Sequence, residues 1–115
     1  MSYMLLIVED PAQRGTRSEA EGQAVYGRMV DFGNELKSEG VLLGVESLVS
    51  KASRVKVRGG KAQVLDGPFA EAKEMIGGFF LLDCDSREQA VAIAKRCPAS
   101  EWATVEVRAL GPCFM

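Results

Sequence analysis

The stretch Met4-Leu5-Leu6-Ile7-Val8 is a continuous apolar run near the start of the chain. A strand with one face in solvent alternates apolar and polar residues, so a continuous run predicts a strand that is covered on both faces. A second continuous apolar strand is predicted at residues 79–83, which begin Phe-Phe-Leu-Leu. The sheet that contains these strands therefore needs a layer of protein on each side.

A long helix is predicted between the first strand and Gly40. Asp10-Pro11 ends the strand, and Thr16 and Ser18 each precede a glutamate by three residues, which is the spacing of a capping box. The helix is expected to run to about Glu39, and Gly40 is placed to end it in a left-handed conformation. Its apolar stripe recurs at three- and four-residue intervals and consists of Ala24, Val25, Met29, Phe32 and Leu36.

Three strands are predicted in the middle of the chain, at residues 41–49, 52–58 and 61–65. In the second of these, valines alternate with basic residues, which is typical of a half-exposed strand. Gly59-Gly60 separates the second from the third and fits a two-residue hairpin turn, because glycine accepts a positive φ at both positions.

The last part of the chain contains a break, a helix and a strand. Asp66-Gly67-Pro68-Phe69 interrupts the strand pattern, and residues 70–76 are expected to form a turn that leads into the strand at 79–83. Ser86 is the predicted cap of a second helix, which Pro98 closes. Residues 104–108 are predicted to form the final strand.

This order of elements predicts an α+β fold, a split βαβ arrangement similar to ferredoxin-like folds, with an added hairpin. Two helices can cover only one face of its sheet, yet two of the strands are apolar on both faces. We therefore expect a second copy of the chain on the other face, giving a homodimer with a cavity between the two sheets.

Composition restricts the classes of function. The 115 residues suit a single domain at 1–115, and 14 Lys+Arg against 16 Asp+Glu give a net charge of −2, which disfavours a nucleic-acid binder. No apolar run approaches the roughly 20 residues of a membrane span, and the N-terminus lacks the features of a signal peptide, so a cytoplasmic location is expected. The chain has no histidine, which excludes Ser-His and Cys-His nucleophiles. With three widely spaced cysteines and no phosphate loop, we expect no metal and no cofactor.

The run from Asp66 to Glu74, Asp-Gly-Pro-Phe-Ala-Glu-Ala-Lys-Glu, followed by Gly77-Gly78-Phe79, resembles the signature of the YCII-related family in its DGPF subgroup. Further matching segments are residues 3–7, 40–48 and 105–108. The resemblance implies a homodimeric α+β barrel built on a ferredoxin-like fold. Some members of the family are linked to extracytoplasmic-function sigma factors, and the wider superfamily includes enzymes that act on muconate-type and lactone substrates.

The sequence departs from the family pattern in two ways. Some YCII-like members are thought to pair a histidine with an aspartate, and that pair is not transferable because this chain has no histidine. Ala109 stands where the subgroup usually has proline, and an additional tail follows it at residues 111–115.

Asp66 is the candidate catalytic residue, with two interpretations. Its carboxylate could accept hydrogen bonds within the turn that it begins. Alternatively it could lie at the mouth of the cavity between the sheets as a general base. Lys73, with its acidic neighbours Glu71 and Glu74, is either a solvated surface residue or a substrate-binding residue.

The other candidate substrate-binding residues are Glu46, Arg108, Phe69 and Tyr3. Arg108 on a strand face is either solvated at a sheet edge or turned into the dimer cavity, where its guanidinium could hold a carboxylate. For Tyr3 and Phe69 the alternative to binding is packing in the core. The leading hypothesis is a dimer that binds a small organic acid and supports acid-base lyase or isomerase chemistry. The other is a non-catalytic accessory protein that acts through protein contacts in a sigma-factor-linked stress circuit.

Overall fold

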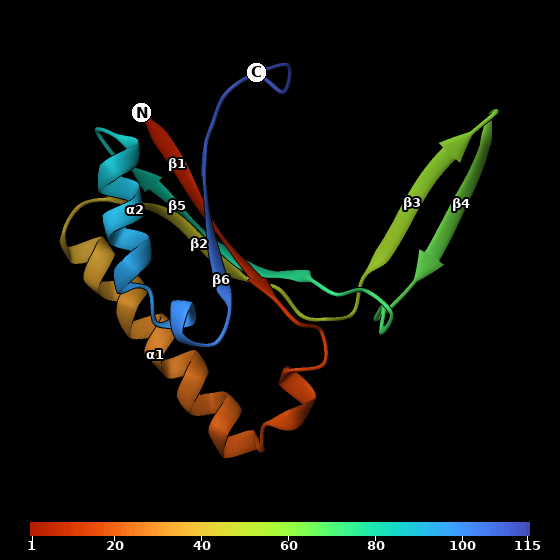
Figure 1. The fold of residues 1–115 in the computed structure, drawn as a ribbon, viewed down its shortest axis with the longest axis horizontal. Coiled ribbons are helices and arrows are strands. Elements are labelled where there is room, and N and C mark those ends of the chain that lie inside the picture. The colour runs from red at the N-terminus through yellow and green to blue at the C-terminus, as the bar shows by residue number, and fades with distance from the viewer.

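The main sheet is four-stranded and antiparallel, with the order β2-β5-β1-β6 (Figure 1). The computed structural model describes residues 1–115. The sheet consists of β1 (Ser2–Glu9), β2 (Leu42–Ser47), β5 (Met75–Asp83) and β6 (Thr104–Ala109), and its helices are α1 (Glu19–Ser38) and α2 (Arg87–Arg96). This is the strand order of a ferredoxin-like α+β fold, so the predicted fold class is confirmed.

Both helices lie on one face of the sheet, and the core lies between them and the sheet (Figure 1). In β1 the side chains alternate: Leu5 and Ile7 are buried toward the helices, while Met4 and Leu6 on the opposite face are half-buried. Phe32 of α1 packs edge-on against Phe80 of β5, with ring centroids 5.3 Å apart. The face opposite the helices, here called the open face, has no layer of the same chain over it.

The hairpin predicted around Gly59-Gly60 is confirmed. Strands β3 (Ser53–Arg58) and β4 (Lys61–Asp66) form a separate two-stranded sheet, in which Gly59 and Gly60 have φ values of 58° and 75°. The hairpin projects away from the main sheet as an arm (Figure 1). No other strand pairs with the arm.

Of the two predicted caps of the first helix, Thr16 and Ser18, the structure shows Ser18 as the cap. Its hydroxyl accepts a hydrogen bond from the Glu21 amide, and the Glu21 carboxylate accepts one from the Ser18 amide. Thr16 instead ends a short 3-10 helix, η1 (Arg14–Thr16), that the sequence did not predict. Gly40 follows the helix with φ of 75°, as expected.

Two predicted boundaries were wrong. Strand β5 begins at Met75, four residues before the predicted start at Phe79, and β2 ends at Ser47 rather than Val49. The reason for the first error is Gly78, which is buried between two strands and pairs with Ile7 on one side and Ser47 on the other. A glycine pair is typical of a turn, but here it allows close approach of neighbouring strands.

The three cysteines are expected to differ sharply in reactivity. Cys84 and Cys97 are both 1% exposed, and burial raises the pKa of each thiol, an effect that Asp83 and Asp85 strengthen for Cys84. Cys113 is exposed. Because the thiolate is the nucleophile, iodoacetamide should modify Cys113 alone in the folded protein and all three thiols after denaturation. Mass spectrometry of the alkylated protein checks this, and rapid native labelling of either buried thiol would contradict it.

Candidate functional site

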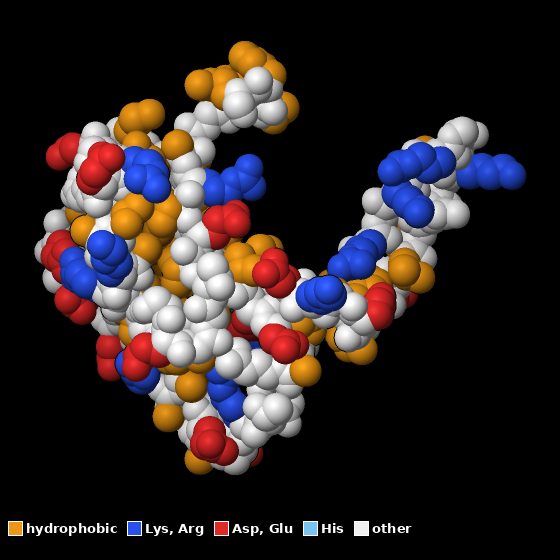
Figure 2. Space-filling model, viewed as in Figure 1, with side chains coloured by type: hydrophobic (Ala, Val, Ile, Leu, Met, Phe, Trp, Pro, Cys, Tyr) orange, Lys and Arg blue, Asp and Glu red, His pale blue; other side chains and the backbone are white.

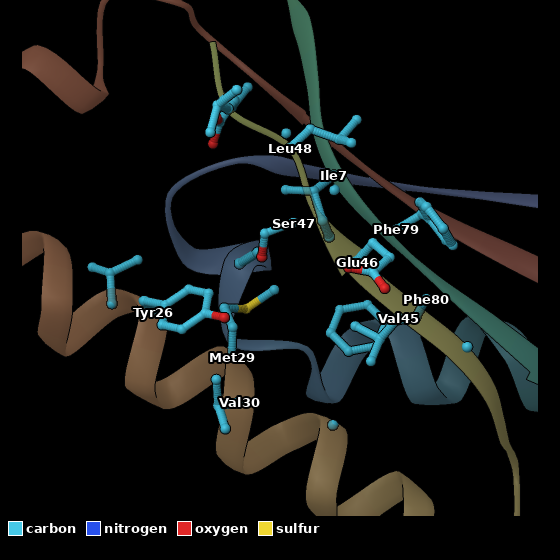
Figure 3. A pocket seen from close by; sticks show the side chains of 18 of the residues that line it. Ile7, Tyr26, Met29, Val30, Val45, Glu46, Ser47, Leu48, Phe79 and Phe80 are labelled. Atoms are coloured by element: carbon cyan, nitrogen blue, oxygen red, sulfur yellow. The ribbon is translucent and has the colours of Figure 1, made fainter. Parts of the chain in front are cut away.

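A groove of about 800 Å³ lies between α1 and the strands β2 and β5, on the helix side of the sheet. Of its 26 lining residues, 14 are hydrophobic, so its character is mainly apolar. Figure 3 shows Tyr26, Met29 and Val30 of α1 on one side, with Val45 of β2 and Phe80 of β5 across from them.

The groove exists because α1 approaches the sheet closely only in its C-terminal half. There, Leu36 is fully buried, and a Cβ on Gly33 would stand 3.7 Å from the Phe80 ring. The N-terminal half of α1 lies farther from the strands (Figure 1). Tyr26 and Val30 consequently remain 58% and 42% exposed although they face the groove.

Arg14 and Glu9 form an ion pair at one end of the groove. The Arg14 Nε lies 2.6 Å from Oε1 of Glu9, whose side chain is 5% exposed. The two remaining nitrogens of Arg14 donate to backbone carbonyls, Nη1 to Leu48 at 2.7 Å and Nη2 to Gly77 at 3.2 Å. All three nitrogens of the guanidinium are thus engaged with the protein, so Arg14 ties β1, β5 and the end of β2 together.

Arg17 is a half-buried cation that lines the groove and has no carboxylate within 4.0 Å. Its guanidinium carbon lies 5.8 Å from the centroid of the Trp102 ring. Arg28 lies over the same ring at 5.4 Å but is paired with Glu101. Of the two arginines beside Trp102, Arg17 is therefore the one available to a bound anion.

The open face carries Glu46 and Arg108 at opposite edges of the sheet. Glu46 on β2 is in register with Phe79 on β5, whereas Arg108 on β6 is in register with Met4 on β1. Since two strands separate β2 from β6, these strands lie about 14 Å apart within one chain, and Arg108 is offset from the level of Glu46 by two further residues. The register of their strands places both on the open face, but a single chain does not bring them together.

The motif that begins at Asp66 forms the base of the arm. The Ser53 hydroxyl donates to Oδ1 of Asp66 at 2.6 Å, and the Gly67 amide donates to the carbonyl of Ala52 at 2.7 Å. Arg54 stacks on the Phe69 ring, with its guanidinium carbon 3.8 Å from the ring centroid. Asp66 and Phe69 therefore stand outside the groove.

Tyr3 and Lys73 also stand outside the groove. Tyr3 is 6% exposed and belongs to the hydrophobic core. Lys73 is exposed and makes no ion pair. Of the substrate-binding residues predicted from the sequence, only Glu46 borders the groove, because it belongs to the edge strand β2; its register with Phe79 places its side chain on the open face.

Comparison with known proteins agrees with this fold. The family model of the YCII-related domain matches residues 1–113. The chain belongs to the YCII-related family. It is also 32% identical, over 97 residues, to an uncharacterised protein of Rhizobium meliloti (strain 1021), and the match covers 83% of this chain and 78% of that protein. The family prediction is confirmed, and membership of the DGPF subgroup stays a prediction.

This YCII-related chain contains no group of three or more His, Cys, Asp or Glu side chains that could hold a metal ion. Neither of its helices has the length and apolar character needed to cross a bilayer.

Glu9, Arg14 and Arg17 were not predicted from the sequence as site residues. Glu9 directly follows a continuous apolar run, so a carboxylate there needs a partner once the strand is buried. This requirement could have identified Glu9 from the sequence as a residue with a buried partner. The link between β1 and α1 contains two arginines, Arg14 and Arg17, and nothing in their spacing distinguishes the paired one from the free one.

Proposed function

We propose that this YCII-related protein binds a small organic acid with an apolar body in the groove between α1 and β2. The observation that carries the proposal is the combination of a mainly apolar groove of about 800 Å³ with the unpaired guanidinium of Arg17. That volume lies within the range of about 300 to 1,000 Å³ that is usual for small-molecule sites.

The two parts of the groove match the two parts of such a ligand. Tyr26, Val30 and Val45 are exposed apolar side chains that a hydrocarbon body would remove from water. Arg17 would hold the carboxylate through charge-assisted hydrogen bonds, while Trp102 limits the freedom of the guanidinium. Arg14 takes no part, because the protein itself engages its nitrogens.

A second candidate site is a cavity between the open faces of two copies. It is favoured by the half-buried apolar side chains Met4, Leu6, Phe79 and Leu81 at the centre of that face. In a homodimer, Arg108 of one copy could approach Glu46 of the other, which would suit an organic acid and acid-base lyase or isomerase chemistry. Asp66 would serve as the base there only if the arm brought it to the mouth of that cavity.

The groove site predicts that Arg17→Gln weakens binding of octanoate by about tenfold to a hundredfold, the range expected for a hydrogen bond to a charged group. Octan-1-ol has the same apolar body and no charge. It should bind the native protein more weakly than octanoate does, and it should bind the native protein and Arg17→Gln with equal affinity. Isothermal titration calorimetry measures each affinity.

The matched control is Arg87→Gln, which removes an exposed arginine of α2 away from the groove. It should leave the affinity for octanoate unchanged. Equal weakening by both substitutions, or equal affinity of the native protein for octanoate and octan-1-ol, would contradict the role of Arg17.

A further inference from the structure

The arm has no hydrophobic core. Each of its strands has six residues, and every one of them is exposed. Val55, Val57 and Val64 are 66%, 57% and 64% exposed. An isolated two-stranded hairpin is at best marginally stable in water, so a hairpin with an exposed valine row is typical of an element that packs against something else.

The two faces of the arm differ in chemistry. Val55 is opposite Val64, and Val57 is opposite Ala62, so these apolar side chains share one face. The opposite face carries the basic residues Arg54, Lys56, Arg58 and Lys61. An occupant that suits the arm therefore offers both apolar surface and negative charge.

The rest of the same chain offers that charge. Residues 51–66 contain five Lys or Arg and one Asp, a net charge of +4. Because the whole chain carries −2, the remaining residues carry −6. A basic arm on an acidic body makes two copies of the chain electrostatically complementary to each other.

We propose that the arm is a clasp that docks on the body of a second copy of this chain. Figure 2 shows a hollow between the body and the arm, on the side toward which the arm extends. At about 3.3 Å per residue the six-residue strands reach about 20 Å, and packed sheets lie about 10 Å apart. An arm of that length beside a second sheet in that hollow would reach past the edge of that sheet.

The motif from Asp66 to Phe69 sets the direction of the clasp. The Asp66–Ser53 hydrogen bond closes the base of the arm, and the Phe69 ring packs against the Arg54 guanidinium beside that base. A Cβ on Gly67 would stand 2.6 Å from the Phe69 ring, so glycine is needed for this contact. These residues are positioning residues for the clasp.

The test is the dimer dissociation constant of the full chain, measured by analytical ultracentrifugation. Lys56→Glu/Arg58→Glu reverses two charges on the basic face and should weaken the dimer by about tenfold or more. Arg87→Glu/Lys95→Glu reverses two exposed charges on α2 and should leave the dimer unchanged. Circular dichroism verifies that both variants fold.

Isotope-mixed cross-linking shows where the arm docks. A zero-length carbodiimide, which joins lysines to carboxylates, is applied to an equal mixture of ¹⁴N- and ¹⁵N-labelled protein. We expect mixed-label links from Lys56 and Lys61 to carboxylates of the body. A monomeric native protein, arm links that are confined to one label, or equal effects of the two double variants would overturn the clasp. Octanoate affinity tests the groove separately, because the groove residues all come from one chain.

Discussion

Replacing Arg14 by alanine is expected to lower the free energy of unfolding by about 3 to 5 kcal/mol. The substitution leaves the Glu9 carboxylate buried, with its side chain 5% exposed and its ion-pair partner gone. It also removes the hydrogen bonds to the carbonyls of Leu48 and Gly77, which join the ends of β2 and β5. Urea unfolding followed by circular dichroism measures the loss.

The control for Arg14 is Arg28→Ala. Arg28 also pairs with a glutamate, Glu101, but both of these side chains are more than half exposed. A surface pair contributes less than about 1 kcal/mol, so the control should change stability little. If Arg14→Ala were no more destabilising than Arg28→Ala, the buried pair would not have the structural role assigned to it.

Gly78→Ala is expected to destabilise the fold by about 3 kcal/mol, near the upper end for overpacking of a core position. A Cβ at this position would stand 2.8 Å from the carbonyl oxygen of Glu46 on the neighbouring strand. The obstacle is backbone rather than the end of a flexible side chain, so β2 and β5 would have to separate. The shift in thermal unfolding temperature measures the effect.

Gly27→Ala is the control, and its expected change in stability has the opposite sign. Gly27 lies within α1, and a Cβ there meets no atom within 4 Å. Alanine is a better helix former than glycine by about 1 kcal/mol, so this variant should be more stable than the native protein. If Gly78→Ala were as stable as Gly27→Ala, this result would contradict the close packing of β5 against β2 at Gly78.

The sequence predicted the elements whose signals are local. The capping box at Ser18, the left-handed residue Gly40 and the paired glycines of the hairpin each determine their own backbone, and the structure contains all three. The continuous apolar run of β1 predicted a strand that is covered on both faces. The helices cover one of these faces, and cover of the other by a second copy stays a prediction.

Features that depend on relative placement could not be predicted. Gly77-Gly78 has the composition of a turn, and only the closeness of the neighbouring strands shows why these glycines lie within β5. The groove depends on the angle between α1 and the sheet, which follows from the close packing at Gly33 and Leu36 rather than from any motif. The partners of Arg14 come from three segments far apart in the sequence.

The motif at Asp66 illustrates a different difficulty. Sequence reasoning left two roles open for Asp66, a turn residue or a general base. In the structure the carboxylate accepts a hydrogen bond across the arm from Ser53, a residue that precedes it by 13 positions. A contact of that kind depends on hairpin register, which can be inferred only once both strands and their turn are known.

A crystal structure of the protein grown with octanoate would show directly where the ligand binds. We expect one octanoate in each groove, with its carboxylate within hydrogen-bonding distance of Arg17 and its hydrocarbon chain between Val30 and Val45. Octanoate bound on the open face beside Arg108, with the groove free of ligand, would contradict the assignment of the groove as the binding site.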